Sequence, residues 1–256
     1  MLFSFISVLE CKEKVADVVF VLDSSDSIWP TDFTKQLDFV KNVVDTFTIG
    51  PNNIQVGVVT FATRIKPNFQ LNTHSDKKQL LAAIASIDRV DGGTNTGTAI
   101  QYVRQEMFKG QNGARKWAAK IVVLITDGFS QDTKKTLLEA SIAHSYDIKV
   151  FAIGVGGGAD SQELDGIASE PTEQHIFRMS NFLLLLLLLP FSGHHQHVVS
   201  SGYSGFLPLL ETHTRKRIIK IILNHIVVPL DSNFMILPVV SVNFKQNPEF
   251  TRVSTR

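Results

Sequence analysis

Three short stretches of the sequence concentrate side-chain oxygen. Asp23, Ser25 and Ser27 alternate in the first, Thr94 lies in a glycine-rich second, and Asp127 lies in the third. Carboxylate and hydroxyl oxygens are hard ligands, which suit Mg²⁺, Mn²⁺ or Ca²⁺ and disfavour zinc or copper. If the stretches meet in space, two carboxylates can balance the charge of one divalent cation while neutral hydroxyls leave it electrophilic.

An ion held in this way still has room for an outside ligand. An octahedral magnesium ion keeps water in its remaining positions or accepts one more oxygen, and a carboxylate of a partner protein is a natural occupant. The chemistry predicted from these residues is therefore coordination of an acidic side chain, without turnover.

The three stretches can meet if the chain forms an open α/β sheet. From about residue 15 to residue 182, apolar runs of strand length alternate with segments of helical periodicity, which is typical of this class. The runs predict strands at 16–22, 54–61, 120–126, 149–154 and 175–178. In such sheets ligands bind outside the carboxyl ends of the strands, and Asp23 and Asp127 each directly follow a predicted strand.

The segments between the strands predict five helices. Their apolar positions are Phe33, Leu37, Val40, Val44 and Phe47; Leu80, Leu81, Ile84 and Ile87; Ile100, Val103 and Met107; Leu137, Leu138 and Ile142; and Leu164 and Ile167. Residues 65–69 follow the second strand too closely for a crossover helix, so they predict an antiparallel edge strand, where Pro67 is tolerated. The expected fold is a doubly wound α/β fold with a mostly parallel sheet, one short antiparallel edge strand and helices on both faces.

Three regions of the chain are expected: an N-terminal segment 1–14, a domain 15–182 and a C-terminal extension 183–256. The extension begins with seven consecutive leucines, which are too few to cross a bilayer, so we expect no membrane span. Beyond them no clear period remains, and the extension is either a genuine region or the product of a faulty gene prediction. The first residues lack the features of a signal peptide.

Composition narrows the classes of partner. The chain has 25 lysines and arginines against 24 acids, so no overall positive field recruits nucleic acid. The hydrophobic fraction of 44% indicates a globular protein with a core. Cys11 is the single cysteine, so the only disulfide open to the chain is an interchain one.

The three stretches together resemble the metal-ion-dependent adhesion site of von Willebrand factor type A domains, of the extracellular type found in collagens and matrilins. They read D-S-S-D-S at 23–27, G-G-T-N-T-G at 92–97 and I-T-D-G at 125–128, and the resemblance extends over roughly residues 14–182. It implies that Ser25, Ser27 and Thr94 contact the metal directly or nearly so, while Asp23 and Asp127 act mainly through water. It also implies an extracellular location and a matrix protein or receptor as the partner, while the ion expected from the oxygen donors is Mg²⁺, or else Mn²⁺ or Ca²⁺.

The sequence departs from that family after residue 182. A final amphipathic helix closes the domain in the family, and Asn181 and Phe182 begin as that helix should. The leucine run then replaces the expected mixture of apolar and charged positions. Because a uniformly apolar helix has no solvated face, we expect this segment to be adhesive unless it is covered.

Two other functions compete with a cation-dependent adhesion or matrix-binding module. One is a structural interaction module that binds partners through another face without metal. The other is a magnesium-dependent phosphoryl-transfer enzyme with Asp23 as the nucleophile. Against the enzyme, Ser25 stands where such phosphatases have a second aspartate, and no G-x-x-x-x-G-K phosphate loop is present. We therefore expect a binding protein that is not an enzyme.

Overall fold

The architecture is known from a computed structural model that describes residues 15–157 and 162–187. Within these residues the strands form one six-stranded sheet in the order β3-β2-β1-β4-β5-β6. The strands are β1 (Ala16–Asp23), β2 (Ile54–Phe61), β3 (Ile65–Phe69), β4 (Ala119–Thr126), β5 (Ile148–Val155) and β6 (Ile176–Met179). All neighbouring pairs are parallel except β2 and β3, which confirms the predicted sheet and its antiparallel edge strand.

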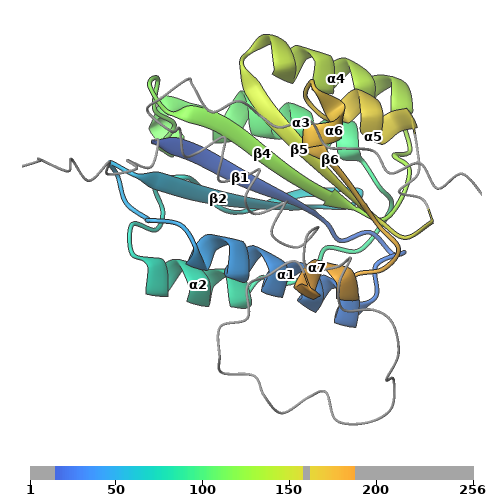
Figure 1. The fold of residues 1–256 in the computed structure, drawn as a ribbon, viewed down its shortest axis with the longest axis horizontal. Helices are drawn as coiled ribbons and strands as arrows, with labels where there is room; N and C mark the ends of the chain where they lie inside the picture. Colours follow the sequence, from blue (N-terminus) through green and yellow to red (C-terminus); the bar gives the residue numbers. More distant parts are fainter. Residues whose placement is uncertain (1–14, 158–161, 188–256) are drawn as a thin grey trace, which may run out of the picture.

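Helices cover both faces of the sheet, as expected (Figure 1). They are α1 (Pro30–Asp45), α2 (Lys77–Ala85), α3 (Thr96–Tyr102), α4 (Thr133–Ser145), α5 (Gln162–Ile167), α6 (Thr172–His175) and α7 (Leu183–Leu187). The first two and α7 lie on one face, and α3, α4 and α5 lie on the other. A π-helical turn, Val103–Met107, continues α3, and a 3₁₀ turn, Gly110–Asn112, follows it.

The core consists of two apolar layers, one on each side of the sheet. Along β1 the side chains alternate between them: Val18 and Phe20 join the layer beneath α1, and Val19 and Val21 join the layer beneath α3. Every residue of β1 and β2 is buried. Because both faces are covered, these strands are mostly apolar in sequence and do not alternate in polarity, which is why they could be predicted.

The edge strand β3 shows how its proline is accommodated. Pro67 pairs with Val59 beside a register shift between Val58 and Val59, and it is exposed. Proline cannot donate to a strand ladder, so it is tolerated at an edge or a bulge, and here both conditions hold.

Several element boundaries differ from the sequence predictions by one or two residues, and one buried face differs as well. The last strand begins at Ile176, because His175 ends α6, and α1 ends at Asp45, although Phe47 is still buried beyond it. In α4 the helix is correct but its buried face is not. Leu138 is 59% exposed, whereas Glu139 is buried because Arg104 of the π-helical turn pairs with it at 2.6 Å.

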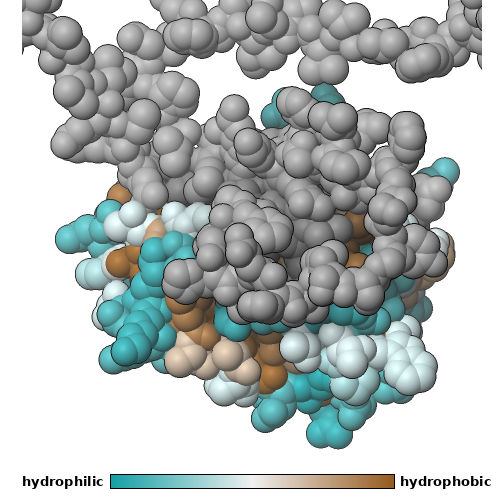
Figure 2. Space-filling model, turned by 60° about the horizontal axis from the view of Figure 1, so that its bottom comes forward, coloured by the Kyte–Doolittle hydropathy of each residue, from teal (hydrophilic) through white to brown (hydrophobic). Residues whose placement is uncertain are grey.

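The first five leucines of the run form α7, which packs against α1. Leu185 is fully buried in the core, so the packed core extends past the predicted boundary at residue 182. Leu183 is 53% exposed, so this helix presents an apolar side chain to solvent where an amphipathic helix would present a polar one. On the side of the molecule that carries α1 and α2, apolar patches lie among hydrophilic side chains (Figure 2).

Some of the expectations concern residues outside the described part of the chain. Cys11, the segment 1–14 and residues 188–256 of the extension all lie there. Within the described ranges, no helix combines the length and the hydropathy needed to cross a membrane.

Candidate functional site

The strand order fixes where a site can form. Strand β1 lies between β2 and β4, so successive connections leave it in opposite directions and open a crevice at the carboxyl ends of β1 and β4. Asp23 is the last residue of β1, and Asp127 directly follows β4. The hydroxyl of Thr126 donates a hydrogen bond to Asp23 Oδ2 at 2.7 Å and joins the two strand ends.

Four of the five predicted ligands form one chain of contacts in this crevice. The backbone N–H of Ser25 donates to Asp23 Oδ1 at 2.9 Å. The hydroxyl oxygens of Ser25 and Ser27 lie 3.0 Å apart, and Ser27 Oγ donates to Asp127 Oδ1 at 2.8 Å. The first and third oxygen-rich stretches are 100 residues apart in sequence, yet their side chains are in direct contact.

The second stretch, with Thr94, lies against both of the others through its backbone. Thr94 O accepts from Gln131 N at 2.9 Å, next to the third stretch. Asp26 and Gly92 exchange two hydrogen bonds, Asp26 N to Gly92 O at 2.9 Å and Gly92 N to Asp26 Oδ1 at 2.8 Å. Thr94 is thereby held at the crevice, half-buried, on a loop tied to the first and third stretches.

The glycine at the start of this loop is required by geometry. Gly92 has a φ of 128°, a left-handed conformation that side chains rarely adopt, and a Cβ there would overlap Thr63. Thr63 Oγ1 in turn accepts from Gly93 N at 2.8 Å, which fixes the loop to the end of β2. The glycine pair therefore permits the close approach that presents Thr94.

Two residues important to the site, Thr126 and Ser24, were not identified as such from the sequence. Thr126 positions Asp23, while Asp26, which was not expected to be a ligand, holds Gly92. Ser24 is fully buried, and its hydroxyl donates to the carbonyls of Phe61 and Val90 at 3.2 and 2.7 Å. Thr126 and Ser24 lie inside the motifs quoted above, and this position was the one signal in the sequence that they belong to the site. Their hydrogen-bond partners, Asp23 for Thr126 and the carbonyls of Phe61 and Val90 for Ser24, are too distant in sequence to be inferred.

The electrostatics of the crevice favour a cation. Asp23 is fully buried, and this burial raises its pKa from the ordinary 3.8 to about 6, although hydrogen bonds from Ser25 and Thr126 oppose the rise; the charge of Asp127 adds to it. Burial also raises the pKa of Asp127, against the hydrogen bond from Ser27. Two adjacent carboxylates whose ionisation is disfavoured are the groups that a divalent cation stabilises most.

The donor set fits a hard cation held by mixed ligands. In residues 15–157 and 162–187, no three His, Cys, Asp or Glu side chains gather into a metal-holding group. A metal in the crevice would therefore need hydroxyl oxygens as well as carboxylates, and Ser25 and Ser27 place two of them beside Asp127. This is the oxygen-only set expected for magnesium, manganese or calcium.

A hollow of about 420 Å³ opens beside the crevice. Ser27 and Asp127 form one wall, and Lys35 of α1 and Phe182 before α7 are among the residues that line the rest. Lys35 is paired with Asp32 at 2.7 Å. A partner side chain that approached the crevice could place its neighbouring residue in this hollow.

The fold and crevice define a doubly wound α/β domain with an oxygen-lined site at the point where the strand order reverses. Residues 17–188 match the von Willebrand factor type A domain family, and the chain belongs to that family.

Relatives of known sequence include matrilins and a collagen. Matrilin-3 of Mus musculus is 39% identical over 175 residues, which is 67% of this chain and 36% of the relative. The collagen alpha-1(XII) chain of Notophthalmus viridescens is 36% identical over 69% of this chain and 19% of its own length. The chain thus spans about a third of the length of the matrilins that it matches.

Solved structures give the same assignment. Proximal thread matrix protein 1 of the mussel byssus, solved with zinc in its MIDAS motif, has a TM-score of 0.60 and 34% identity over 68% of this chain and 43% of its own. The TRAP protein of Plasmodium vivax, at 20% identity and a TM-score of 0.57, supports the fold alone. Zinc thus occupies the motif of that mussel relative, although oxygen donors favour harder ions.

Proposed function

We propose that this chain is a divalent-cation-dependent protein-binding module, in which Asp23, Ser25, Ser27, Thr94 and Asp127 hold the ion. The observation that carries the proposal is the continuous contact from Asp23 through the two serines to Asp127 at the end of the sheet where the strand order reverses. Its hydroxyls are neutral, so an ion bound there retains positive charge. The ion is magnesium, manganese or calcium.

The partner is a protein that offers an acidic side chain. A carboxylate would complete the coordination of the ion, and the hollow beside Ser27 and Asp127 would receive an adjacent residue of the partner. No bond is made or broken in this interaction, so the module is not an enzyme. Relatives named as matrix protein and collagen support an extracellular matrix protein or receptor as the partner, and a secreted location.

The rim of the crevice supports recognition of a protein. Trp29 and Phe129 are 72% and 60% exposed, and each lies two residues beyond a proposed ligand, Ser27 or Asp127. Exposed aromatic side chains of this kind are enriched at protein interfaces. They would provide apolar contact around a central charged contact.

The coordination vacancy can be tested with manganese and acetate. Mn²⁺ bound to the protein enhances the relaxation of water protons, and acetate stands for the partner's carboxylate. We expect acetate to displace bound water and to lower the enhancement in the wild-type chain. Asp127→Ala should bind the ion at least tenfold more weakly, whereas Asp45→Asn, a change in an exposed side chain at the last residue of α1, should bind it as the wild type does. Acetate-insensitive relaxation would rule out the partner's carboxylate as a ligand.

A further inference from the structure

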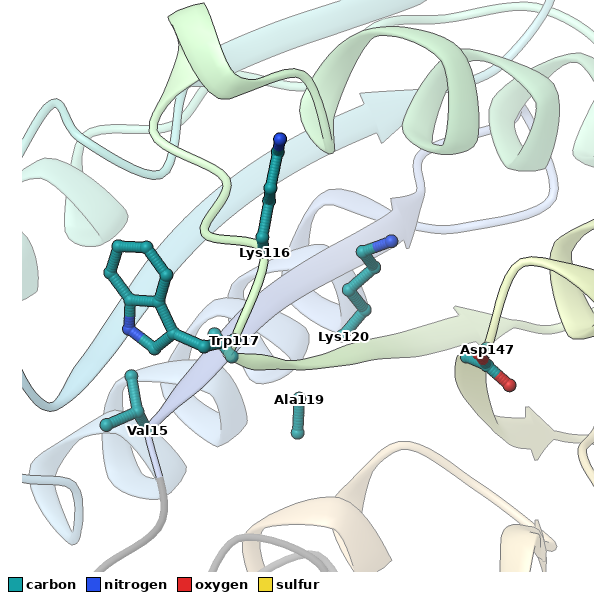
Figure 3. A pocket seen from close by; sticks show the side chains of 7 residues that line it. Val15, Lys116, Trp117, Ala119, Lys120 and Asp147 are labelled. Atoms are coloured by element: carbon teal, nitrogen blue, oxygen red, sulfur yellow. The ribbon is translucent and has the colours of Figure 1, made fainter.

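A second hollow, of about 620 Å³, lies at the opposite end of the sheet from the crevice (Figure 3). Its apolar lining is Val15, which precedes β1, with Ala118 and Ala119 at the start of β4. Asp147, in the turn before β5, lies across it. Seven residue steps along β1 place this end roughly 23 Å from Asp23, so the two surfaces are separate.

The hollow is bordered by a strongly exposed tryptophan. Trp117 projects from the loop that enters β4 and is 77% exposed, more than any other large apolar side chain in the described ranges. An indole offers a large apolar area for contact, and tryptophan is among the residues most often found at the energetic centre of interfaces.

The loop that carries Trp117 is fixed by a buried ion pair. Arg115 is only 8% exposed, and its backbone N–H and side-chain Nε donate to the two oxygens of the fully buried Asp17 at 2.7 and 2.9 Å. The same guanidinium donates to three backbone carbonyls of β1 and of the turn before β2. The indole is therefore presented on a preorganised loop, which lowers the entropy lost on binding.

The charges at the rim select the kind of partner. The charged residues that line the hollow are Lys116, Lys120 and Asp147, so the rim carries a net positive charge, while the charge of Arg115 outside it is neutralised by Asp17. Two lysines offset by an acid are too few for a polyanion such as a nucleic acid, which needs many cationic contacts. An apolar floor beside two lysines instead suits a peptide with an apolar side chain next to a carboxylate.

We propose that this hollow, with Trp117 as its anchor, is a second docking surface for an acidic segment of a partner protein that carries an apolar residue. It needs no metal, because it shares no residue with the crevice. With surfaces at both ends of the sheet, the domain can hold two partners at once. Binding at this surface is also distinguishable from the proposed cation-dependent function, since a chelator abolishes only the latter.

The chain offers its own reporter for this surface. It contains two tryptophans, so Trp29→Phe leaves Trp117 as the single one. The probe is a displayed library of random ten-residue peptides, selected in EDTA on the full Trp29→Phe chain and counter-selected on Trp29→Phe/Trp117→Ser. We expect the enriched peptides to contain Asp or Glu beside an aromatic or aliphatic residue. A synthetic copy should shift Trp117 emission to shorter wavelength in a saturable way.

Two charge-reversal variants, one inside the hollow and one outside it, distinguish docking from nonspecific adhesion. Lys116 is exposed, so Lys116→Glu leaves the fold intact, and it should weaken the peptide about tenfold. Lys134→Glu changes an exposed lysine on α4, outside the hollow, and should leave the affinity unchanged.

Several results would overturn the proposal. They are a Trp117 emission that is already that of a buried indole without peptide, no enrichment that depends on Trp117, enrichment of basic peptides, and equal effects of the two lysine reversals. The first would mean that the chain itself fills the hollow. Saturable binding of a sulfated polysaccharide in place of acidic peptides would also contradict it.

Discussion

Replacing Asp23 by asparagine should stabilise the metal-free protein and remove its response to metal. The folded protein raises the pKa of Asp23 from 3.8 to about 6 because the carboxyl is buried, so keeping it ionised at neutral pH costs about 3 kcal/mol. Asparagine is neutral and removes this cost. It keeps an oxygen for Ser25 N, but its amide faces the Thr126 hydroxyl, which must then turn its proton toward Gly128 O, 3.2 Å away. We expect a net gain of about 2 kcal/mol in the free energy of unfolding.

The pH dependence gives the sign of this effect independently. The folded state binds the Asp23 proton more tightly than the unfolded chain does, so the penalty is absent below the unfolded pKa of 3.8 and complete above about 6. At pH 4 the penalty falls to about 0.6 kcal/mol, so the advantage of Asp23→Asn should disappear there. Urea unfolding followed by circular dichroism, in EDTA at pH 7.5 and pH 4, measures it.

Magnesium should reverse the order of the two proteins. A ligand at 100 times its Kd stabilises the folded state by about 2.7 kcal/mol, and only the wild-type chain should gain this amount. Asp45→Asn, which makes the same change on an exposed side chain at the last residue of α1, serves as the control. The reasoning is refuted if Asp23→Asn is less stable than the wild type in EDTA at pH 7.5, or if its advantage does not change with pH.

Three further predictions concern the buried pair of Arg115 and Asp17, the packing of α3 against α4, and the competition between protons and metal for Asp23. Arg115→Met leaves Asp17 buried without its cation and should lower the free energy of unfolding by about 3 to 5 kcal/mol, measured by urea unfolding, against almost no change for Lys116→Met at its exposed neighbour. Gly97→Ala places a Cβ 2.8 Å from a backbone nitrogen of α4 and should cost about 1 to 3 kcal/mol in the same assay, whereas Gly110→Ala meets nothing within 4 Å. Because a proton and a metal compete for Asp23, calorimetry should show Mn²⁺ affinity about tenfold weaker at pH 5 than at pH 7.5; equal affinities would contradict this.

The sheet could be predicted because its strands are covered on both faces. The runs at 16–22 and 54–61 contain no polar residue apart from Asp17, Gln55 and Thr60, and the structure buries every residue of β1 and β2. The short gap before residues 65–69 excluded a crossover helix, which fixed β3 as antiparallel. These inferences depended on local sequence, so long-range information was not needed.

The features that escaped prediction depend on contacts between distant residues. The buried face of α4 includes Glu139 because Arg104, 35 residues earlier, neutralises it. The pair of Asp17 and Arg115 links residues 98 positions apart. Neither pair can be recognised from neighbouring residues. An acid in a predicted strand or helix is expected to be exposed to solvent unless its cationic partner is known.

The sequence predicted which residue types form the candidate site and which strand ends and loops carry them. Asp23, Ser25, Ser27 and Asp127 come into direct contact, and Thr94 lies on a loop fixed beside them. Their role as metal ligands stays a prediction. The sequence could not show that Thr126 orients Asp23, because that hydrogen bond exists only once β1 and β4 pair.

Equilibrium dialysis with Mn²⁺ tests the central claim most directly, since it counts the ions that the folded chain holds. The account predicts one ion per wild-type chain and a loss of at least tenfold in affinity when one ligand side chain is removed from any of the three loops, by Ser25→Ala, Thr94→Ala or Asp127→Ala. No bound ion, or an ion whose affinity survives all three substitutions, would contradict it.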